Sequence, residues 1–319
     1  MTIEMVLNEL SLRARAVDVY AARERMANFV DTLQAATATG VGRVLRTAED
    51  FHDTVLAPDY MLARWRNDPE VDRECRRYVL TLTTKAPHLA DLTPGELAGE
   101  PALFDFGYEG ARADGLAAAF LTDALAVSLL SEARWDTTAL QLEVTHLDDN
   151  AMTVTRFEAI HHASRRAHVV QHGAWIGERI RAGIRDGTDL WSRRIDLLPS
   201  LVFCESVRAQ LEGLRSGNPL LRSVRDRLFE FQEYCGTWNS GPFEGRRLPT
   251  RVSPESQATL NQYGAERTFL CPDCQERVFS LHARVTPGSW RIHFIPLADE
   301  HRVLIGYIGP HLPTANDPT

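Results

Sequence analysis

Two short stretches near the C-terminus alternate strictly between apolar and polar residues. In residues 281–285 (LHARV) and 290–294 (WRIHF), every second side chain is apolar. This alternation is typical of a strand with one buried face. Residues 286–289 (TPGS) carry the turn signals of a four-residue loop. The pattern predicts a hairpin in which Val285 pairs with Trp290, followed by a third strand over 302–308.

The register of this hairpin decides which side chains share its polar face. With Val285 opposite Trp290, Arg284 lies opposite Arg291 and His282 lies opposite His293. Like charges directly opposite each other are unfavourable in a sheet. Such a face therefore needs an anion or carboxylates from elsewhere in the chain. The alternative is a solvated face whose charges are offset by residues 299–300 (DE) or by acids from the first 200 residues.

The remaining pattern predicts a mixed succession of helices and strands. Apolar residues recur at helical spacing over 17–36, and Pro69 is well placed to begin a charged helix over 69–83. Two more helices, 203–215 and 219–235, are separated by a turn. Strands are expected at 4–12, 41–45 and 193–202, and in four pieces between 101 and 157, with a helix from 174 to 184.

These elements predict an α+β fold with two regions. We expect a mixed N-terminal α/β region over residues 1–200, because residues 197–199 (LLP) mark a break. A two-helix module with an antiparallel sheet of three or four strands follows over 201–319.

Charge is distributed unequally between these regions. The 319 residues carry a net charge of −8; residues 201–319 contain 13 arginines and 13 acids, so residues 1–200 hold the whole acidic excess. A local anion site in the C-terminal region is compatible with this balance. The chain has no apolar run of membrane-spanning length, and its first residues (MTIEMVLNEL) do not resemble a secretory signal. We therefore expect a cytoplasmic protein without a membrane partner.

Two groups of residues are candidate metal ligands. Cys271 and Cys274 form a CPDC pair, which is half of a four-ligand zinc site; the alternative is a tight turn with two ordinary thiols. His168 and His172 are four residues apart, so one helical face would carry both, with His161 and His162 nearby. A metal-dependent hydrolase that uses this cluster is one functional hypothesis, and a partly buried histidine cluster is the alternative.

Other catalytic motifs are incomplete or missing. Carboxylates that could hold Mg²⁺ lie on or near predicted strands, but Thr145 stands where a restriction-type nuclease core has its lysine. The single lysine, Lys85, lies in no phosphate-binding loop, which argues against a nucleotide-hydrolysing motor. The carboxylates in question are Asp105, Glu109, Asp114, Glu143 and Asp148. Asp148, Asp149 and Glu158 are the acids near the histidine cluster in sequence.

The C-terminal order of two helices and three antiparallel strands resembles the small RelE-type bacterial toxins. Those ribonucleases work without a metal and use basic, histidine and tyrosine side chains on an exposed sheet face. The long segment 236–268 departs from their compact pattern. The resemblance implies RNA binding or cleavage at the C-terminal face. The matching residues would be His282, Arg284, Arg291, His293 and Tyr307, with His311 as a further candidate.

Several phrases also resemble segments of an uncharacterised family of bacterial proteins encoded near anti-phage defence genes. These are NELSL, GLAAAFLTDALAVSLLS, RVSPES and IGYIGPHLPT. The resemblance implies a component of a defence system with other protein subunits as partners. The enzymatic hypothesis is a metal-independent, toxin-like ribonuclease. The alternative is a non-catalytic subunit that binds a partner within a larger defence complex.

Overall fold

The computed structural model describes residues 3–47, 49–84, 104–147, 152–286 and 288–317. The chain forms two compact units, Met1–Ile180 and Arg181–Thr319, so the division falls before the position near residue 200 expected from the sequence. Both units combine helices with sheets, which confirms the α+β class. None of the described helices is long and apolar enough to cross a lipid bilayer.

The first unit is built on a seven-stranded mixed sheet with the order β2-β1-β7-β9-β8-β5-β6. Strands β2, β1, β7 and β9 are parallel, whereas β9, β8, β5 and β6 pair antiparallel. The strands are β1 (Met5–Leu7), β2 (Leu45–Arg46), β5 (Phe104–Tyr108), β6 (Ala111–Arg112), β7 (Leu125–Val127), β8 (Ala139–Leu147) and β9 (Thr153–Ala163). A separate two-stranded sheet joins β3 (Val55–Ala57) to β4 (Tyr60–Met61).

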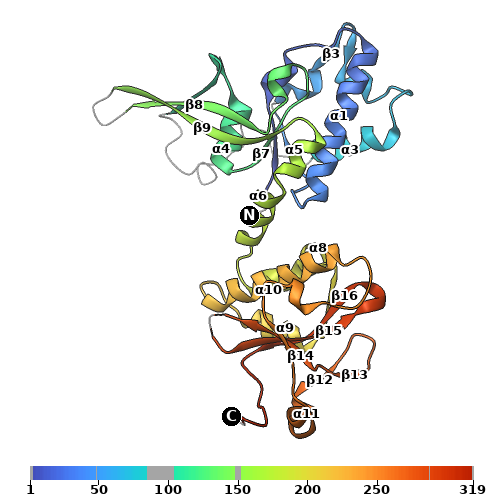
Figure 1. The fold of residues 1–319 in the computed structure, drawn as a ribbon. Helices are drawn as coiled ribbons and strands as arrows, with labels where there is room; N and C mark the ends of the chain where they lie inside the picture. Colours follow the sequence, from blue (N-terminus) through green and yellow to red (C-terminus); the bar gives the residue numbers. More distant parts are fainter. Residues whose placement is uncertain (1–2, 48, 85–103, 148–151, 287, 318–319) are drawn as a thin grey trace. The chain divides into compact units, whose positions relative to one another are not determined.

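Helices cover both faces of the parallel part of this sheet (Figure 1). Met5 and Leu7 belong to one core cluster with α1 (Val19–Ala38), whereas Val6 belongs to a second with α4 (Asp114–Thr122). This division follows from the alternation of side chains along a strand. The predicted helix over 17–36 is confirmed as α1, capped by Asp18. The other helices are α2 (Leu62–Trp65), α3 (Arg73–Thr84), α5 (Arg166–Gln171) and α6 (Gly173–Ala182).

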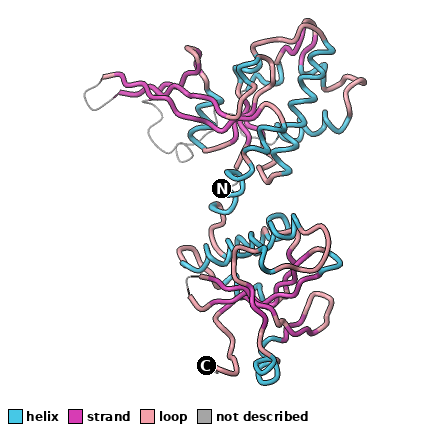
Figure 2. The backbone as a smooth tube through the Cα atoms, in the orientation of Figure 1, coloured by secondary structure: helices cyan, strands magenta, loops and turns pink. Residues whose placement is uncertain are grey.

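The second unit is built on a five-stranded sheet with the order β10-β16-β15-β14-β11. Figure 2 shows the strands of this unit in magenta and its helices in cyan. β10 is parallel to β16, and the other neighbours are antiparallel. The strands are β10 (Leu201–Phe203), β11 (Val252–Pro254), β14 (Leu281–Val285), β15 (Trp290–Leu297) and β16 (Arg302–Gly309). The predicted hairpin is confirmed in register: Val285 pairs with Trp290, Arg284 with Arg291, and His282 with His293.

One helix supplies much of the core on one face of this sheet. α10 (Pro219–Thr237) begins where Asn218 caps its first turn, and the ring of Phe231 packs 4.7 Å from that of Phe294. The predicted helix over 203–215 is shorter in the structure, because Phe203 ends β10 and α9 (Ser206–Glu212) starts after it. The other helices are α7 (Gly187–Ser192), α8 (Arg194–Leu197) and α11 (Gln257–Tyr263).

The later part of the long segment between α10 and β14 folds against the opposite, polar face of the sheet, whereas Phe243 near its start packs on Phe294. It contains β11, α11 and a hairpin of β12 (Thr268–Leu270) and β13 (Glu276–Val278). The Phe269 and Tyr307 rings stack with centroids 5.8 Å apart, and Phe269 also meets Phe279 edge to face. Phe279 is fully buried against Gly306, where a Cβ atom would lie 2.5 Å from its ring. This segment therefore covers part of the face that the sequence presents as polar.

Candidate active site

The polar face of the second sheet brings together the five residues expected from the sequence. These are His282, Arg284, Arg291, His293 and Tyr307. His282 and His293 are directly opposite, with ring centroids 5.5 Å apart, and His293 is in turn paired with Tyr307. Arg284 and Arg291 form the next pair along the hairpin. The face is thus divided into a histidine end and an arginine end.

A carboxylate from elsewhere in the chain reaches the histidine end. Glu255 directly follows β11, and its backbone N–H donates to the Ser280 carbonyl 2.7 Å away. Because Ser253 pairs with His282, Glu255 is a diagonal neighbour of this histidine on the same face. Oε1 of Glu255 lies 3.0 Å from Nδ1 of His282. This side chain brings a negative charge to the histidine end of the face and does not pair with either arginine of the hairpin.

Glu255 is also paired with a fully buried arginine. Nε of Arg267 lies 3.1 Å from the same Oε1, and the exposures of the two side chains are 0% and 5%. Arg267 also donates from Nη1 to the Tyr263 carbonyl, while its Nη2 has no hydrogen-bond partner among the described residues. The N–H directions of His282 and Arg267 deviate from the lines to Oε1, so both contacts are electrostatic rather than well-aligned hydrogen bonds.

The two histidines occupy different environments. His293 is 1% exposed, and its Nδ1 lies 3.4 Å from the Phe279 carbonyl oxygen. Burial lowers the pKa of His293 to about 3, so the ring is neutral at physiological pH. The side chain of His282 is 12% exposed. Burial lowers its pKa as well, but the Glu255 carboxylate acts in the opposite direction. Of the two, His282 is therefore better placed to exchange a proton.

The arginine end is open and positively charged. Arg284 is exposed, whereas Arg291 is partly buried. Nη1 of Arg291 donates a hydrogen bond to the backbone carbonyl of Trp290, the preceding residue. Burial and the adjacent Arg284 lower the pKa of Arg291. Neither guanidinium forms an ion pair with a carboxylate in the described parts of the chain. Two cations without such partners on adjacent strands are suited to bind an anion.

Tyr307 and His311 border this face at the end of β16. The Tyr307 hydroxyl donates to the Pro310 carbonyl 3.0 Å away, and burial raises the pKa of its phenol. Burial lowers the pKa of His311, and Arg291 and Glu255 are among the charges that act on it. The chain beyond His311 is held against α11, since the Ala315 N–H donates to Oγ1 of Thr259. These contacts close the face on the side of the C-terminal tail.

One group of three metal-ligating side chains is found among the described residues. The ligand atoms of Glu255, His282 and His293 all lie within 4.8 Å of one another. Two histidines and a carboxylate are a ligand set that transition metals accept. However, Arg267 already neutralises the Glu255 carboxylate, and Arg291 acts electrostatically on His282. A divalent cation bound by these three side chains would therefore add positive charge close to Arg267 and Arg291 at a largely buried position, which is unfavourable.

Cys271 and Cys274 belong to no group of three metal-ligating side chains among the described residues. Residues 271–274 form a tight turn in which the Cys274 N–H donates to the Cys271 carbonyl, with Cys274 in the left-handed region at φ 63°. Cys271 is buried, whereas Cys274 is exposed. The cysteine beside Cys271 is Cys204, whose pKa is raised to about 12, mainly by burial. This arrangement agrees with the expected alternative of two ordinary thiols in a turn.

The histidine cluster of the first unit is occupied by contacts within the protein. His162 is fully buried between the Thr137 carbonyl and Oγ of Ser128, at 2.8 Å and 2.7 Å, and burial lowers its pKa to about 4. His161 stacks on Trp175 with ring centroids 4.0 Å apart. Nε2 of His168 lies 3.3 Å from Oδ1 of Asp136. Nε2 of His172 lies 3.0 Å from each of two backbone carbonyl oxygens, those of Thr138 and His162.

These contacts favour a structural histidine cluster over a metal site. No group of three ligands forms there among the described residues, and the acids Asp105, Glu109, Asp114 and Glu143 form none either. Lys85, Asp148 and Asp149 lie outside the described residues.

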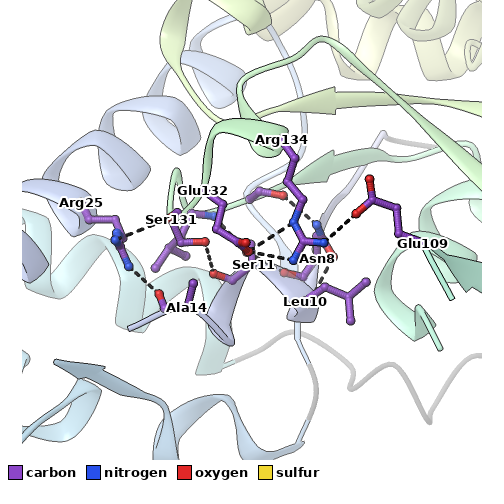
Figure 3. Close-up of polar contacts among 11 residues, drawn as sticks. Asn8, Leu10, Ser11, Ala14, Arg25, Glu109, Ser131, Glu132 and Arg134 are labelled. Carbon is purple, nitrogen blue, oxygen red and sulfur yellow. Dashed lines mark hydrogen bonds and ion pairs between the residues drawn. The ribbon is translucent and has the colours of Figure 1, made fainter. Parts of the chain in front are cut away.

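Loops at the carboxyl ends of β1 and β7 also carry a polar network (Figure 3). In open α/β sheets ligands often bind at such a position. Here the polar groups satisfy one another: Arg134 pairs with Glu109 and Glu132, and Oγ of Ser131 donates to the Ser11 carbonyl. The adjacent cavity has a volume of about 10 Å³, which is room for little more than a water molecule. The network therefore stabilises the loops and leaves no space for a ligand.

Comparison with protein-family models, with curated proteins and with solved structures finds no match to this chain.

Two residues of the site, Glu255 and Arg267, were not identified from the sequence. The opposed charges of the hairpin do predict that carboxylates from elsewhere must reach this face. Which acid does so depends on the pairing of β11 with β14, and β11 has only three residues, including a proline. The sequence offered Asp299 and Glu300 as one alternative source of offsetting charge, and in the structure Glu300 pairs with Arg302. The sequence therefore indicates that a carboxylate must reach the hairpin, but it does not indicate that Glu255 is the residue that does so.

Proposed function

We propose that the C-terminal unit binds RNA on its polar face and cleaves it without a metal ion. The observation that carries this proposal is the contact of Glu255 with His282 beside Arg284 and Arg291, which form no ion pair with a carboxylate among the described residues. A carboxylate on Nδ1 favours the tautomer in which Nδ1 bears the proton. Nε2 of His282 is then free to accept a proton at neutral pH. Catalytic hydrogen bonds are often poorly aligned before substrate binds, as this one is.

The reaction that fits these groups is intramolecular transesterification of RNA. His282 removes the proton of a ribose 2′-hydroxyl, and the 2′-oxygen attacks the adjacent phosphorus. The bond from phosphorus to the 5′-oxygen breaks, and this oxygen takes up a proton from water as it leaves. The products are a 2′,3′-cyclic phosphate and a 5′-hydroxyl end. Arg291 and Arg284 stabilise the negative charge that increases on the phosphorane oxygens.

RNA, rather than another anion, is proposed because the resemblance to RelE-type toxins concerns the same sheet and the same residue types. The resemblance to proteins encoded near defence genes supports a role for this activity in a bacterial defence system. In that setting, cleavage of RNA would limit phage replication. Other protein subunits would then control when the face is accessible.

The direct test is incubation of the purified full-length chain with single-stranded RNA in EDTA. We expect cleavage products that end in a 2′,3′-cyclic phosphate, and no cleavage of DNA of the same sequence, because DNA lacks the 2′-hydroxyl. RNA ends bearing a 3′-hydroxyl, or cleavage that requires added Mg²⁺, would rule out this mechanism.

A non-catalytic partner-binding role is the second candidate, and a separate feature of the same unit favours it. A cavity of about 630 Å³ borders β10, α8 and the start of the CPDC turn. Ile195 and Leu270 line it and are 71% and 58% exposed, which is unusual for large apolar side chains. Capture of neighbouring gene products that is lost on changing Leu270→Asp, together with no RNA cleavage, would favour this role.

A further inference from the structure

The longest strand of the first unit has one edge that lacks a strand partner over most of its length in the described parts of the chain. β9 pairs with β8 over Thr153–His161, but β7 pairs with its other edge only at His162 and Ala163. No other described strand pairs with β9 along 153–161. Residues 153–157 are all exposed, and Phe157 is 66% exposed. In Figure 1 the β8–β9 hairpin extends away from the body of its unit.

This edge lacks several of the features that usually prevent strands from associating, and its two charged residues, Arg156 and Glu158, have opposite signs. Proline, lysine, bulges and very short length are common protections of an edge strand. Residues 153–159 (TVTRFEA) contain neither proline nor lysine, and the ladder with β8 runs without a register shift. Threonine, valine and phenylalanine are residues that favour strand pairing. The edge therefore offers another strand a row of backbone groups that no described strand pairs with.

We propose that two copies of this chain associate through β9, edge to edge and antiparallel, with a two-fold axis at Phe157. In this register Arg156 of each copy lies opposite Glu158 of the other. Val154 lies opposite Ile160, and the pairing extends from residue 153 to residue 161. This span matches the part of β9 that β7 leaves unpaired. The proposal concerns the first unit and does not depend on the function proposed for the second.

The charges on this edge select the register. Arg156 and Glu158 lie on the same face of β9, with Nε and Oε1 3.0 Å apart. Pairing about Phe157 places opposite charges against each other across the interface, which stabilises a sheet. A two-fold axis at Arg156 would place this arginine opposite Arg156 of the other copy, and an axis at Glu158 would likewise place two glutamates opposite each other. Pairing about Thr155 would leave both charges without an opposite partner.

A second copy is the occupant that this pattern fits best. A two-fold interface uses the same surface on both molecules, so its sequence must complement itself when reversed. The order Arg156, Phe157, Glu158 has this property. When a second copy runs in the opposite direction with Phe157 opposite Phe157, each arginine lies opposite a glutamate. An unrelated peptide would need no such symmetry.

The charge swap is the first test, on the full-length chain by sedimentation equilibrium over a roughly hundredfold concentration range. We expect the wild type to form a dimer. Arg156→Glu or Glu158→Arg alone should raise the dissociation constant by roughly tenfold or more, because each creates two like-charge contacts. The double variant should restore the wild-type constant. A wild type that stays monomeric, or a dimer that neither single variant weakens, would overturn the proposal.

Cross-linking tests the register independently. On a two-fold axis, a cysteine at position 157 faces its own copy, whereas one at 154 does not. In a Cys274→Ser background, which removes the exposed native thiol, we expect Phe157→Cys to give a disulfide-linked dimer under mild oxidation and Val154→Cys to give much less. No cross-link at 157, or an equal or stronger one at 154, would contradict the arrangement.

Discussion

Nδ1 of His282 lies 3.0 Å from Oε1 of Glu255, a residue that reaches the sheet from a neighbouring strand. This contact orients the imidazole on a face that otherwise carries opposed basic residues. The same carboxylate oxygen is 3.1 Å from Nε of the buried Arg267. Glu255 therefore links the stability of the covering segment to the protonation of the proposed base.

The pH dependence of RNA cleavage should reveal this link. The Glu255 carboxylate raises the pKa of His282 against the lowering effect of burial. In Glu255→Gln this contribution is lost, so the pKa of His282 falls further and the acidic limb of the rate profile should move to lower pH. Measurement of kcat/KM from pH 4 to 8 checks this. An unchanged limb, with altered activity at every pH, would indicate a purely structural role for Glu255.

Buried Arg267 should be important for stability. Arg267→Met leaves the 5% exposed Glu255 carboxylate without its arginine. We expect a loss of about 3–5 kcal/mol in the free energy of unfolding, measured by urea titration. Arg277→Met is the matched control, because Arg277 pairs with Asp273 at an exposed position and should cost less than about 1 kcal/mol. Similar losses for both variants would contradict the assigned importance of burial.

Acidification should destabilise the second unit through His293. Its pKa is about 3 in the folded state and 6.5 when unperturbed, so the unfolded chain binds more protons between these values. This contribution to the free energy of unfolding is therefore fully present above pH 6.5. It decreases by about 1.4 kcal/mol per pH unit as the pH falls towards 3. Hydrogen exchange of β15 at pH 7 and pH 5 measures this. His293→Phe should reduce the difference; an equal difference in the variant would exclude His293 as its source.

Removal of Arg291 should weaken RNA binding and its salt dependence together. Arg291→Ala removes one cation without a described carboxylate partner, so the slope of log affinity against log salt should decrease by about 1. Arg208→Ala is a suitable control, because Arg208 pairs with Glu212 on α9. Binding measured by fluorescence anisotropy at several salt concentrations distinguishes the two. An equal effect of both variants would mean that RNA does not contact the polar face.

The hairpin could be predicted from sequence because its alternation and its turn specify one register. Val285 and Trp290 flank four turn residues, and a shift of one residue would expose the apolar set. The extent of burial could not be predicted in the same way. His293 is covered by Phe279 and the segment before it, and these contacts join residues whose proximity only the folded chain reveals.

The histidine cluster shows the same limit in the first unit. His168 and His172 have the spacing of metal ligands, but they point at Asp136 and at backbone carbonyl oxygens. Spacing along a helix indicates a shared face and does not indicate what lies opposite. The unit boundary likewise falls within a continuous helix, α6, where no turn signal marks it.

RNA cleavage in EDTA by three proteins tests the proposed function most directly. The wild type, His282→Ala and Arg291→Ala should be compared at equal concentration, with their folding checked by circular dichroism. We predict cleavage by the wild type and a loss of roughly a hundredfold or more on removal of the base, with a smaller loss for the arginine variant. Equal activity in all three proteins, or no cleavage by the wild type, would contradict the account.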